Sequence, residues 1–453
     1  MKKTKIVCTI GPASNNEETL RKMIEAGMNV ARFNFSHGSH ETQKANLDLV
    51  RKVREEMGVP VATMMDTKGP EIRFRDFENG KITLVKGQEF TLSPEEFLGD
   101  STRGSITYAG LAGDVKVGNL LLVNDGLIQL EITGIQGKEI ITKVLVPGDI
   151  VNHKGINAPG ADLKMPFISD QDKKDILFGI EQDYDYIALS FVRTAKDVEA
   201  VRAILDFNDS KMKIIAKIES TQGVENLEGI LAAADGLMVA RGDMGVELPP
   251  EQVPYIQKRM IDMTNAAGKI SICATQMLES MTHNPRPTRA EVGDVANAVY
   301  EGTSAVMLSG ESAAGDYPLE SVQMMAKIAE ETEKHIKGEY NPNDRSQRSI
   351  VGKAACDLAD ELKVDKIIVY TDTGRSPGVV SQIKPITPII VMTRNAKVYY
   401  QSALLYGVEP VRIADIIEEE NLEPKTREYM KEAGIHSAVL LFGHAIDSIK
   451  VLN

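Results

Sequence analysis

Hydrophobic and polar positions along this chain repeat in a pattern of a short apolar run followed by a helical stretch. The run Lys213-Ile-Ile-Ala-Lys217-Ile-Glu219 is the clearest example of the apolar part. A continuous run of this kind is typical of a parallel-sheet strand that is buried on both faces. Because side chains alternate along a strand, Lys217 and Glu219 are expected to project from one face, as a cation beside an anion. The alternative is an ordinary solvated ion pair, which is the commoner use of a single Lys-x-Glu.

The strand pattern occurs eight times, and most copies are followed by apolar residues at helical spacing. The first helix is expected after Ser14-Asn-Asn-Glu17, which has the spacing of a capping box, and to stop at Gly27; another opens at Thr194-Ala-Lys-Asp197. Eight strand-helix units over about 250 residues outside an insertion predict an α/β fold, the (β/α)₈ TIM barrel. The predicted strands are residues 4–10, 29–33, 61–65, 186–189, 213–218, 236–240, 269–273 and 304–308.

Two parts of the chain leave this repeat. From residue 71 onward, short alternating runs are broken by glycine and by Asn124-Asp-Gly126, which indicates an inserted small β-barrel domain. After a helix near 319–334, the polar stretch 338–348 is predicted to be a linker. Strands at 366–370, 388–392 and 438–441 then alternate with helices. We predict a catalytic barrel (1–70 and 160–337), an inserted lid (71–159) and a C-terminal α/β domain (338–453).

Composition narrows the class of protein. The chain has 453 residues, 42% hydrophobic and 26% charged, which is ordinary for a globular protein of about two to four domains. No apolar run approaches membrane-spanning length, and Ile6–Ile10 is too short for a signal peptide. The cysteines, Cys8, Cys273 and Cys356, are odd in number and far apart, which favours a reducing cytoplasm. A net charge of -13 argues against nucleic-acid binding, so an anionic substrate would need a local basic pocket.

Polar residues gather where the predicted strands end. In a barrel these ends meet in one cup, where unpaired charges would be very costly, so a metal ion or a charged ligand is implied. The residues are Arg32 and Asn34 after the second strand, Asp66, Thr67 and Lys68 after the third, Lys217 and Glu219 after the fifth, Arg241, Gly242 and Asp243 after the sixth, Thr275 after the seventh, and Ser309, Gly310 and Glu311 after the eighth.

The residue types at these ends suggest particular chemistry. Two carboxylates from neighbouring strands, Glu219 and Asp243, suit Mg²⁺, which prefers one or two carboxylates plus water and substrate oxygens; the alternative is a pair of helix caps. The cations Arg32, Arg73 and Lys217 would stabilise a transferring phosphoryl group, unless they only pair with those carboxylates. Hard oxygens suit a monovalent cation, or else serve as turn hydrogen bonds, at Asn34, Ser36, Asp66 and Thr67.

Standard sequence motifs identify neither a nucleotide-binding loop nor a hydrolase nucleophile in this chain. The chain has no Gly-x-x-x-x-Gly-Lys loop, so a nucleotide would have to be held by the barrel mouth and the inserted domain. Gly374-Arg-Ser-Pro-Gly378 matches a hydrolase nucleophile elbow, but the strand before it ends near Tyr370, too early for a sharp strand-to-helix turn. The stretch Thr371–Ser376 is better interpreted as a loop whose amides could cradle a phosphate, or as an ordinary connection.

Longer segments of the chain resemble the pyruvate kinase family, and they span the barrel from end to end. These segments are Ala31-Arg-Phe-Asn-Phe-Ser-His-Gly38, Asp66-Thr-Lys-Gly-Pro-Glu-Ile-Arg73, His153-Lys-Gly-Ile-Asn157, Lys217-Ile-Glu219, Met238-Val-Ala-Arg-Gly-Asp243, Cys273-Ala-Thr-Gln-Met-Leu-Glu-Ser-Met281, Pro285-Arg-Pro-Thr-Arg-Ala-Glu291 and Met307-Leu-Ser-Gly-Glu311. The resemblance implies the glycolytic transfer of the phosphoryl group of phosphoenolpyruvate to ADP, which gives pyruvate and ATP.

The resemblance also implies roles for individual residues. Lys217 would be the charge stabiliser at the phosphoryl group, and the catalytic set would add Arg32, Arg73 and Thr275. The substrate would be bound by Lys217, Gly242, Asp243, Thr275 and Arg32. Glu219 and Asp243 would hold Mg²⁺ (or Mn²⁺), and Asn34, Ser36, Asp66 and Thr67 would hold K⁺. The nucleotide phosphates would lie against Arg32, Asn34, Phe35, Ser36, His37, Arg73 and Lys154.

Further expectations follow from the same likeness. Family members that need K⁺ usually have glutamate where this chain has Glu71, so we expect K⁺ dependence. Thr275, acting through water, is preferred to Lys217 as the proton donor to the enolate, with an N-cap role as the alternative for Thr275. The C-terminal domain departs from the family: Thr373 replaces a usual serine, and the chain closes from Leu441 to Asn453 without the usual Gly-Thr-Thr-Asn loop. A phosphorylated effector is therefore in doubt, and a homotetramer is implied by resemblance alone.

Two other classes of function remain in view at this stage. One is an inactive sensor, in which the C-terminal domain binds a metabolite; the intact charged set Lys217, Glu219 and Asp243 weighs against it. The other is a Mg²⁺-dependent aldol lyase acting on oxo acids from the same barrel, which Arg32 and Arg73 disfavour. A lactate-dehydrogenase-coupled assay with phosphoenolpyruvate and ADP separates the three hypotheses.

Overall fold

The structure, a computed structural model, describes residues 2–336, 346–413, 421–443 and 448–452. Its centre is a closed barrel of eight parallel strands in the order β1-β17-β16-β15-β14-β13-β3-β2, which confirms the predicted barrel. Each predicted strand lies within one residue of an observed one at both ends. The strands are β1 (Lys5–Thr9), β2 (Val30–Asn34), β3 (Ala62–Asp66), β13 (Tyr186–Leu189), β14 (Lys213–Ile218), β15 (Gly236–Ala240), β16 (Ile270–Ala274) and β17 (Ala305–Leu308).

The alternation of side chains along β14 decides which residues enter the barrel. Ile214 and Ile218 belong to the hydrophobic cluster that packs under the surrounding helices, whereas Ile215 belongs to the cluster of the barrel interior. Because side chains two apart share a face, Lys217 lies on the interior side with Ile215. The strand therefore places a lysine at the inner rim of the mouth.

Helices surround the barrel and confirm one predicted helix start but not the other. The first helix begins at Glu17, and Asn16 caps it by accepting the amide of Thr19 at 2.9 Å; the capping box predicted at Ser14 is wrong, because Ser14 instead hydrogen-bonds Gly11 in the preceding turn. The helices are α1 (Glu17–Glu25), α2 (His40–Met57), α4 (Asp170–Glu181), α5 (Ala195–Phe207, opening after Thr194 as predicted), α6 (Thr221–Glu225), α7 (Leu227–Ala233), α8 (Arg241–Glu247), α9 (Val253–Ala266), α10 (Arg289–Tyr300), α11 (Gly310–Ala313) and α12 (Pro318–Glu333).

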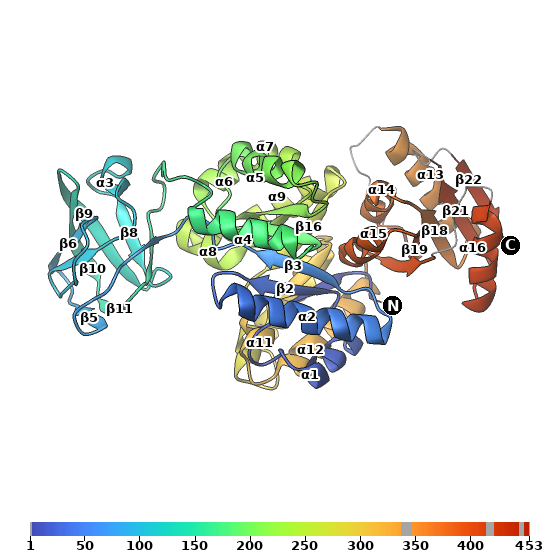
Figure 1. Cartoon of the computed structure of the whole chain (residues 1–453), viewed down its shortest axis with the longest axis horizontal. Helices are drawn as coiled ribbons and strands as arrows, with labels where there is room; N and C mark the ends of the chain where they lie inside the picture. Colours follow the sequence, from blue (N-terminus) through green and yellow to red (C-terminus); the bar gives the residue numbers. More distant parts are fainter. Residues whose placement is uncertain (1, 337–345, 414–420, 444–447, 453) are drawn as a thin grey trace.

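The insertion follows β3 and is built of strands that pair antiparallel, except for the parallel pair β6 and β7, around its own core at one end of the molecule (Figure 1). A seven-stranded sheet has the order β4-β12-β8-β9-β10-β6-β7, and a bridge between Phe74 and Ile106 joins its two ends. β5 and β11 pair separately. The elements are β4 (Ile72–Arg73), β5 (Lys81–Leu84), β6 (Glu89–Ser93), β7 (Arg103–Ser105), α3 (Leu111–Asp114), β8 (Leu120–Val123), β9 (Ile128–Gln136), β10 (Glu139–Val146), β11 (Gly148–Val151) and β12 (Gly155–Asn157).

The C-terminal region forms a five-stranded α/β sheet in the order β20-β19-β18-β21-β22, and only β22 runs antiparallel to its neighbour. Most of the predicted linker 338–348 lies outside the described residues, and its last two residues begin α13. The sequence patterns did not indicate β20 or β22. The elements are α13 (Gln347–Leu362), β18 (Lys366–Tyr370), α14 (Arg375–Ile383), β19 (Ile389–Thr393), α15 (Ala396–Gln401), β20 (Val408–Arg412), α16 (Leu422–Glu432), β21 (Ala438–Phe442) and β22 (Ser448–Leu452).

The C-terminal sheet and the insertion lie at opposite ends of the barrel (Figure 1). At the amino-terminal ends of the strands, the ammonium of Lys5 donates to the carbonyl of Val408 at 2.7 Å, and one hydrophobic cluster contains both Val7 of the barrel and Val439 of the C-terminal sheet. The other end of the barrel, where the strands finish, is thus the end that faces the insertion. Within the described part of the chain, no helix has the length and apolar content needed to cross a bilayer.

Candidate active site

Lys217 lies at the centre of the polar residues at the barrel mouth. Its ammonium donates to Ser190 Oγ at 2.6 Å, to Asp66 Oδ1 at 3.0 Å and reaches Glu219 Oε1 at 3.1 Å. The side chain is buried, with two hydrogen bonds, to Ser190 and Asp66, and an ion pair with Glu219. The alternation predicted along this strand is confirmed, but the pair with Glu219 is a buried contact, not a solvated one.

Asp66 joins the two cations of the mouth. One carboxylate oxygen accepts from Lys217, and the other accepts from Arg32 Nε at 2.6 Å. Arg32 also donates to the hydroxyl of Thr9 at 2.8 Å. Burial would raise the pKa of Asp66, but Arg32 and Lys217 outweigh it and hold this pKa below its usual value. The alternative in which the cations pair with Glu219 and Asp243 therefore holds for Lys217 and Glu219, whereas the carboxylate that pairs with Arg32 is Asp66.

Glu219 and Asp243 form the acidic side of the mouth. Glu219 follows β14, and Asp243 lies in the first turn of α8 after β15, the strand paired with β14. Glu219 accepts the amide of Phe191 at 2.5 Å. Burial raises the pKa of Glu219; Lys217 opposes this only in part, and the charge of Asp243 adds to it. A carboxylate whose charged form is disfavoured by burial and by a second carboxylate belongs to a donor set that fits a divalent cation.

In the part of the chain that the structure describes, no larger metal cluster competes with this pair. Within the described residues, no group of three or more His, Cys, Asp or Glu side chains could hold a metal ion. A site of two carboxylates leaves the remaining coordination positions to water or to ligand oxygens, which is how Mg²⁺ is usually bound. The residues present therefore fit Mg²⁺ better than a metal that needs a cage made wholly of protein groups.

Thr275 lies in a constrained loop at the end of β16. Its φ is +66°, and that of the next residue, Gln276, is +53°. The Thr275 hydroxyl accepts the amide of Gly242 at 2.7 Å and donates to the carbonyl of Ala274 at 2.6 Å. Arg241 donates to the carbonyl of Thr275 at 2.7 Å, which holds the loop. The Thr275 hydroxyl, which follows the neighbouring strand β16, thus accepts an amide of the first turn of α8. This is a form of the helix-capping role that was the alternative interpretation of Thr275.

The last residue of β2 and the loop from β2 to α2 together carry four predicted site residues. Asn34 accepts the amide of Ser36 at 3.0 Å, so its side chain makes the turn hydrogen bond considered above. Gln43 fixes the loop by donating to the carbonyls of Asn34 at 2.9 Å and of His37 at 2.8 Å. Phe35 is buried in this loop. On the neighbouring strand, the carbonyl of Thr67 accepts the hydroxyl of Ser190 at 2.7 Å.

A cleft of about 520 Å³ opens between the barrel mouth and the insertion. It is lined on the barrel side by Asp243 and on the insertion side by Arg73 and Lys154. The guanidinium of Arg73 pairs with Glu71 at 2.6 Å, so it belongs to the base of the insertion and not to a barrel strand. The cleft also reaches Phe191, whose amide donates to Glu219, and Ser220, which follows Glu219 in the sequence.

Ser190 is the residue at the mouth that the sequence patterns missed. It follows β13, the fourth barrel strand, and touches both Lys217 and Thr67. The signal was available, because Ser190 occupies the same position after its strand as the polar residues that follow the second, third and fifth strands. Inspection of every strand end would have included it.

The C-terminal loop has its own internal hydrogen bonds. The hydroxyl of Thr371 accepts the amides of Thr373 at 3.3 Å and of Gly374 at 3.0 Å. Ser376 is buried within α14, so the arrangement differs from a nucleophile elbow, whose serine is exposed. Of the closing run from Leu441 to Asn453, residues 444–447 and 453 lie outside the described part, and most of the remainder belongs to β21 and β22.

Comparison with known proteins agrees with this architecture. A family model described as "Pyruvate kinase, barrel domain" matches residues 1–322, and one described as "Pyruvate kinase, alpha/beta domain" matches residues 350–440. Among solved structures, a pyruvate kinase from Cryptosporidium parvum superposes with a TM-score of 0.95 and 36% identity, covering 100% of this chain and 96% of the other.

Curated relatives give the same result at higher identity. The pyruvate kinase of Sporosarcina psychrophila is 48% identical over 420 residues, which cover 91% of this chain and 72% of the relative. That of Clostridium acetobutylicum is 45% identical over 419 residues, which cover 91% of this chain and 89% of the relative. With the barrel, the C-terminal sheet and the matches over 91% of its length all in agreement, this chain belongs to the pyruvate kinase family.

Proposed function

We propose that the barrel mouth is where this chain performs the reaction of its family, the glycolytic transfer of the phosphoryl group of phosphoenolpyruvate to ADP. The observation that supports this placement is the buried ammonium of Lys217, held between Asp66 and Glu219 beside a cleft. Burying such a charge is costly unless partners and function compensate it. A loose phosphoryl transition state is stabilised mainly by fixed positive charge of this kind.

Lys217 is the proposed charge stabiliser, and Arg32 lies behind it. Asp66 accepts a hydrogen bond from each cation and so fixes the orientation of both at the barrel mouth. The pKa of Lys217 is lowered by burial but raised more by Asp66 and Glu219, so its amine stays charged at neutral pH. A permanently charged ammonium suits the stabilisation of an enolate oxygen better than it suits the donation of a proton.

Glu219 and Asp243 are the proposed ligands of Mg²⁺, or of Mn²⁺ in its place. When bound, the divalent ion would supply positive charge to the phosphoryl and enolate oxygens. Asn34, Ser36, Asp66 and Thr67 are the proposed K⁺ ligands, and they offer oxygen atoms within one connected set of loops. Glu71, held by Arg73, is the residue that points to a need for K⁺.

The proposed keto-acid site comprises Gly242, Asp243 and Thr275, with Arg32 and Lys217 facing it. For Thr275 to pass a proton through water to the enolate, its hydroxyl would first have to release the carbonyl of Ala274. The nucleotide phosphates are assigned to the loop and cleft residues Arg32, Asn34, Phe35, Ser36, His37, Arg73 and Lys154. The cleft between barrel and insertion has room for a ligand of this class.

The insertion, residues 71–159, is the proposed lid over the nucleotide. Asn157 of β12 donates to Glu247 of α8 at 3.0 Å, so the insertion already contacts the barrel at the rim of the cleft. A lid there would exclude water from the phosphoryl transfer. The domain bounds 1–70 with 160–337 and 338–453 are further proposals that rest on the sequence pattern, and a cytoplasmic location is one that rests on the cysteines. A phosphorylated effector near Thr371–Ser376 and a homotetramer are proposals that rest on family likeness.

The coupled assay with lactate dehydrogenase tests the proposal directly. We expect oxidation of NADH that depends on both phosphoenolpyruvate and ADP and on added Mg²⁺ or Mn²⁺. The purified chain should show no pyruvate release from oxo-acid aldols, which an aldol lyase would produce. Absence of turnover with both substrates and the metal present would favour the inactive sensor instead.

A further inference from the structure

Ser190 is the uncharged partner of Lys217 at the barrel mouth. We propose that Ser190 is a positioning residue that fixes the ammonium of Lys217 and connects it to the proposed K⁺ ligand Thr67. This inference rests on the proposed role of Lys217 in phosphoryl transfer. Ser190 would therefore influence the rate of the reaction only through the positions of Lys217 and Thr67.

The direction of the hydrogen bonds at Ser190 follows from what each group can donate. An ammonium can only donate, so the oxygen of Ser190 accepts from Lys217 at 2.6 Å. The single hydroxyl proton of Ser190 is then left for an acceptor, and the carbonyl of Thr67 lies at 2.7 Å, closer than Asp66 Oδ1 at 3.2 Å. A continuous relay therefore runs from the Lys217 ammonium through Ser190 to the Thr67 carbonyl.

The backbone around Ser190 keeps this hydroxyl in place. Its own amide donates to the hydroxyl of Thr67 at 3.2 Å, and the amide of Phe191 donates to Glu219 at 2.5 Å. Phe191 has a φ of +55°, an uncommon conformation that this bond helps to hold. Ser190 itself is buried, with 3% of its surface exposed. The hydroxyl is therefore fixed before any ligand arrives, as a supporting residue of a precise site should be.

The three partners of Lys217 are not equivalent. All three are held by a further bond inside the protein: Asp66 by Arg32, Ser190 by Thr67, and Glu219 by the amide of Phe191. Asp66 and Glu219 are also proposed cation ligands and so are shared with the reaction site. Ser190 is the uncharged partner and is not a proposed ligand of either cation. Loss of Ser190 would leave the ammonium with the two carboxylates and a wider range of positions.

The test uses Ser190→Ala in the full-length chain and the coupled assay. We expect kcat to fall about 10- to 100-fold while the KM for phosphoenolpyruvate changes by less than about threefold, because outer partners of a reacting group affect the rate more than binding. We also expect the K⁺ concentration that gives half-maximal rate to rise. Ser190→Thr, which keeps the hydroxyl, should recover much of the lost rate.

The matched control is Ser321→Ala. Ser321 is also a fully buried serine of the barrel domain whose hydroxyl donates to a backbone carbonyl, that of Tyr317 at 2.7 Å, but it lies in α12 away from Lys217. Its loss should lower stability without changing kcat or the K⁺ response. If the two alanine variants lose the same rate, Ser190 has only a structural role and the proposal is wrong.

The remaining outcomes also decide between the hypotheses. Wild-type kcat and an unchanged K⁺ response in a folded Ser190→Ala variant overturn the proposal. If that variant does not fold, Ser190→Cys replaces it, because a thiol is a weaker hydrogen-bonding group than a hydroxyl. A kcat of Ser190→Cys below that of the wild-type chain supports the proposal, and a wild-type kcat overturns it. An inactive wild-type chain, or an active Lys217→Met variant, would instead refute the proposed function on which this inference rests.

Discussion

The charged side chains at the barrel mouth are paired with one another. Arg32 and Lys217 share Asp66, and Lys217 also reaches Glu219. These four side chains are almost fully buried, so each charge depends on its partners for stability. Asp243, near Glu219, leaves the set with one carboxylate in excess, which is the condition that a cation would relieve. The residue types alone did not reveal this pairing.

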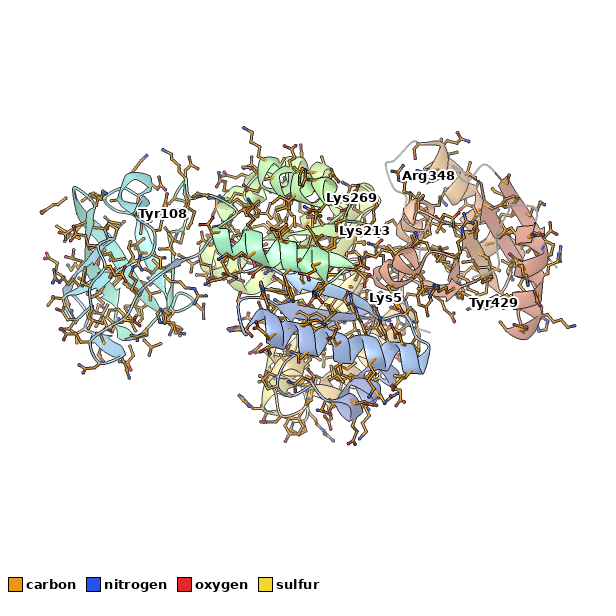
Figure 2. The ribbon with its side chains drawn as sticks, viewed as in Figure 1. Lys5, Tyr108, Lys213, Lys269, Arg348 and Tyr429 are labelled. Carbon is orange, nitrogen blue, oxygen red and sulfur yellow. The ribbon has the colours of Figure 1, made fainter. Side chains whose placement is uncertain are left out.

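Replacing Lys217 by Met tests its proposed role. We expect kcat to fall by about 10³-fold, because a fixed cation that stabilises developing negative charge is lost, while Mn²⁺ binding measured by electron paramagnetic resonance persists. Lys213→Met is the matched control, since Lys213 lies on the same strand at its other end, near the C-terminal sheet (Figure 2). A mild loss of kcat in Lys217→Met would show that its role is misassigned.

Removal of K⁺ tests the monovalent-cation site. In buffer free of K⁺ and Na⁺, with a large organic cation replacing them, we expect turnover to fall and to return when K⁺ is added. The reason is that Asp66 and Thr67 would then face the substrate without the cation that their oxygens are proposed to bind. Undiminished turnover in that buffer would refute the prediction drawn from Glu71.

At the scale of elements, short turns at strand ends hold the site together. Gly69 lies between β3 and the insertion with a φ of +71°, and its amide donates to Asp172 of α4 at 3.1 Å. A Cβ at this position would lie 2.8 Å from the carbonyl oxygen of Ser190. Both the backbone conformation and the close approach therefore require glycine here. This turn connects the barrel mouth to the base of the proposed lid.

Gly69→Ala should reduce stability more than a glycine substitution that adds strain alone. The control is Gly58→Ala: its φ is +66°, but a Cβ there would meet nothing within 4 Å. We expect Gly58→Ala to lose about 1 kcal/mol of unfolding free energy and Gly69→Ala to lose about 1–3 kcal/mol more, because it adds overlap to the strain. Urea unfolding measures both. Equal losses of unfolding free energy in the two variants would show that the backbone at Ser190 shifts at little cost to accommodate the added Cβ.

Element prediction succeeded where periodicity is strong and failed at edges and caps. The barrel strands are continuous buried runs, so local pattern identified them. β20 was missed because it contains Pro410, which argues against a strand unless the strand lies at a sheet edge, as β20 does. β22 is the other edge, and its residues are partly exposed. At the first helix, two possible capping residues stand close together, and Asn16 caps it in place of Ser14.

At the scale of the whole molecule, the C-terminal sheet closes the amino-terminal end of the barrel (Figure 2 labels Lys5 at this junction). Lys5 is buried here and Lys384 is half-buried; Lys5 donates to the carbonyl of Val408, and Lys384 donates to that of Gly302 across the same junction. Burial lowers the pKa of each amine to about 7. For Lys5, the nearby Lys2 lowers the pKa further, and Glu333 and Glu409 oppose the shift only in part.

These two amines predict how stability depends on pH. Their pKa values are about 7 in the folded chain but near 10.5 when unfolded, so between these limits the unfolded chain binds more protons. The free energy of unfolding should therefore rise with pH across that window, by up to about 1.4 kcal/mol per pH unit for each group, and stay constant below it. Urea unfolding at pH 7 and pH 9 measures the change.

Lys5→Met provides the comparison for this pH dependence. It removes one of the two titrating amines, so the gain in unfolding free energy between pH 7 and pH 9 should be smaller than in the wild-type chain. Replacing the exposed Lys86, for which no such burial exists, should leave the gain unchanged. If Lys5→Met and the wild-type chain gain the same amount, the buried amine does not contribute to the linkage.

The sequence by itself determined the strand-helix repeat, the interruption by an insertion, and the charged residues at the strand ends. These are local properties, because hydrophobic periodicity records which face of each element is buried. Only the tertiary structure decided which residues meet: Lys217 with Asp66, 151 positions away, and with Ser190, and Lys5 with Val408, 403 positions away. Periodicity carries no information about the partner across the barrel, since closure and docking alone bring such distant side chains together.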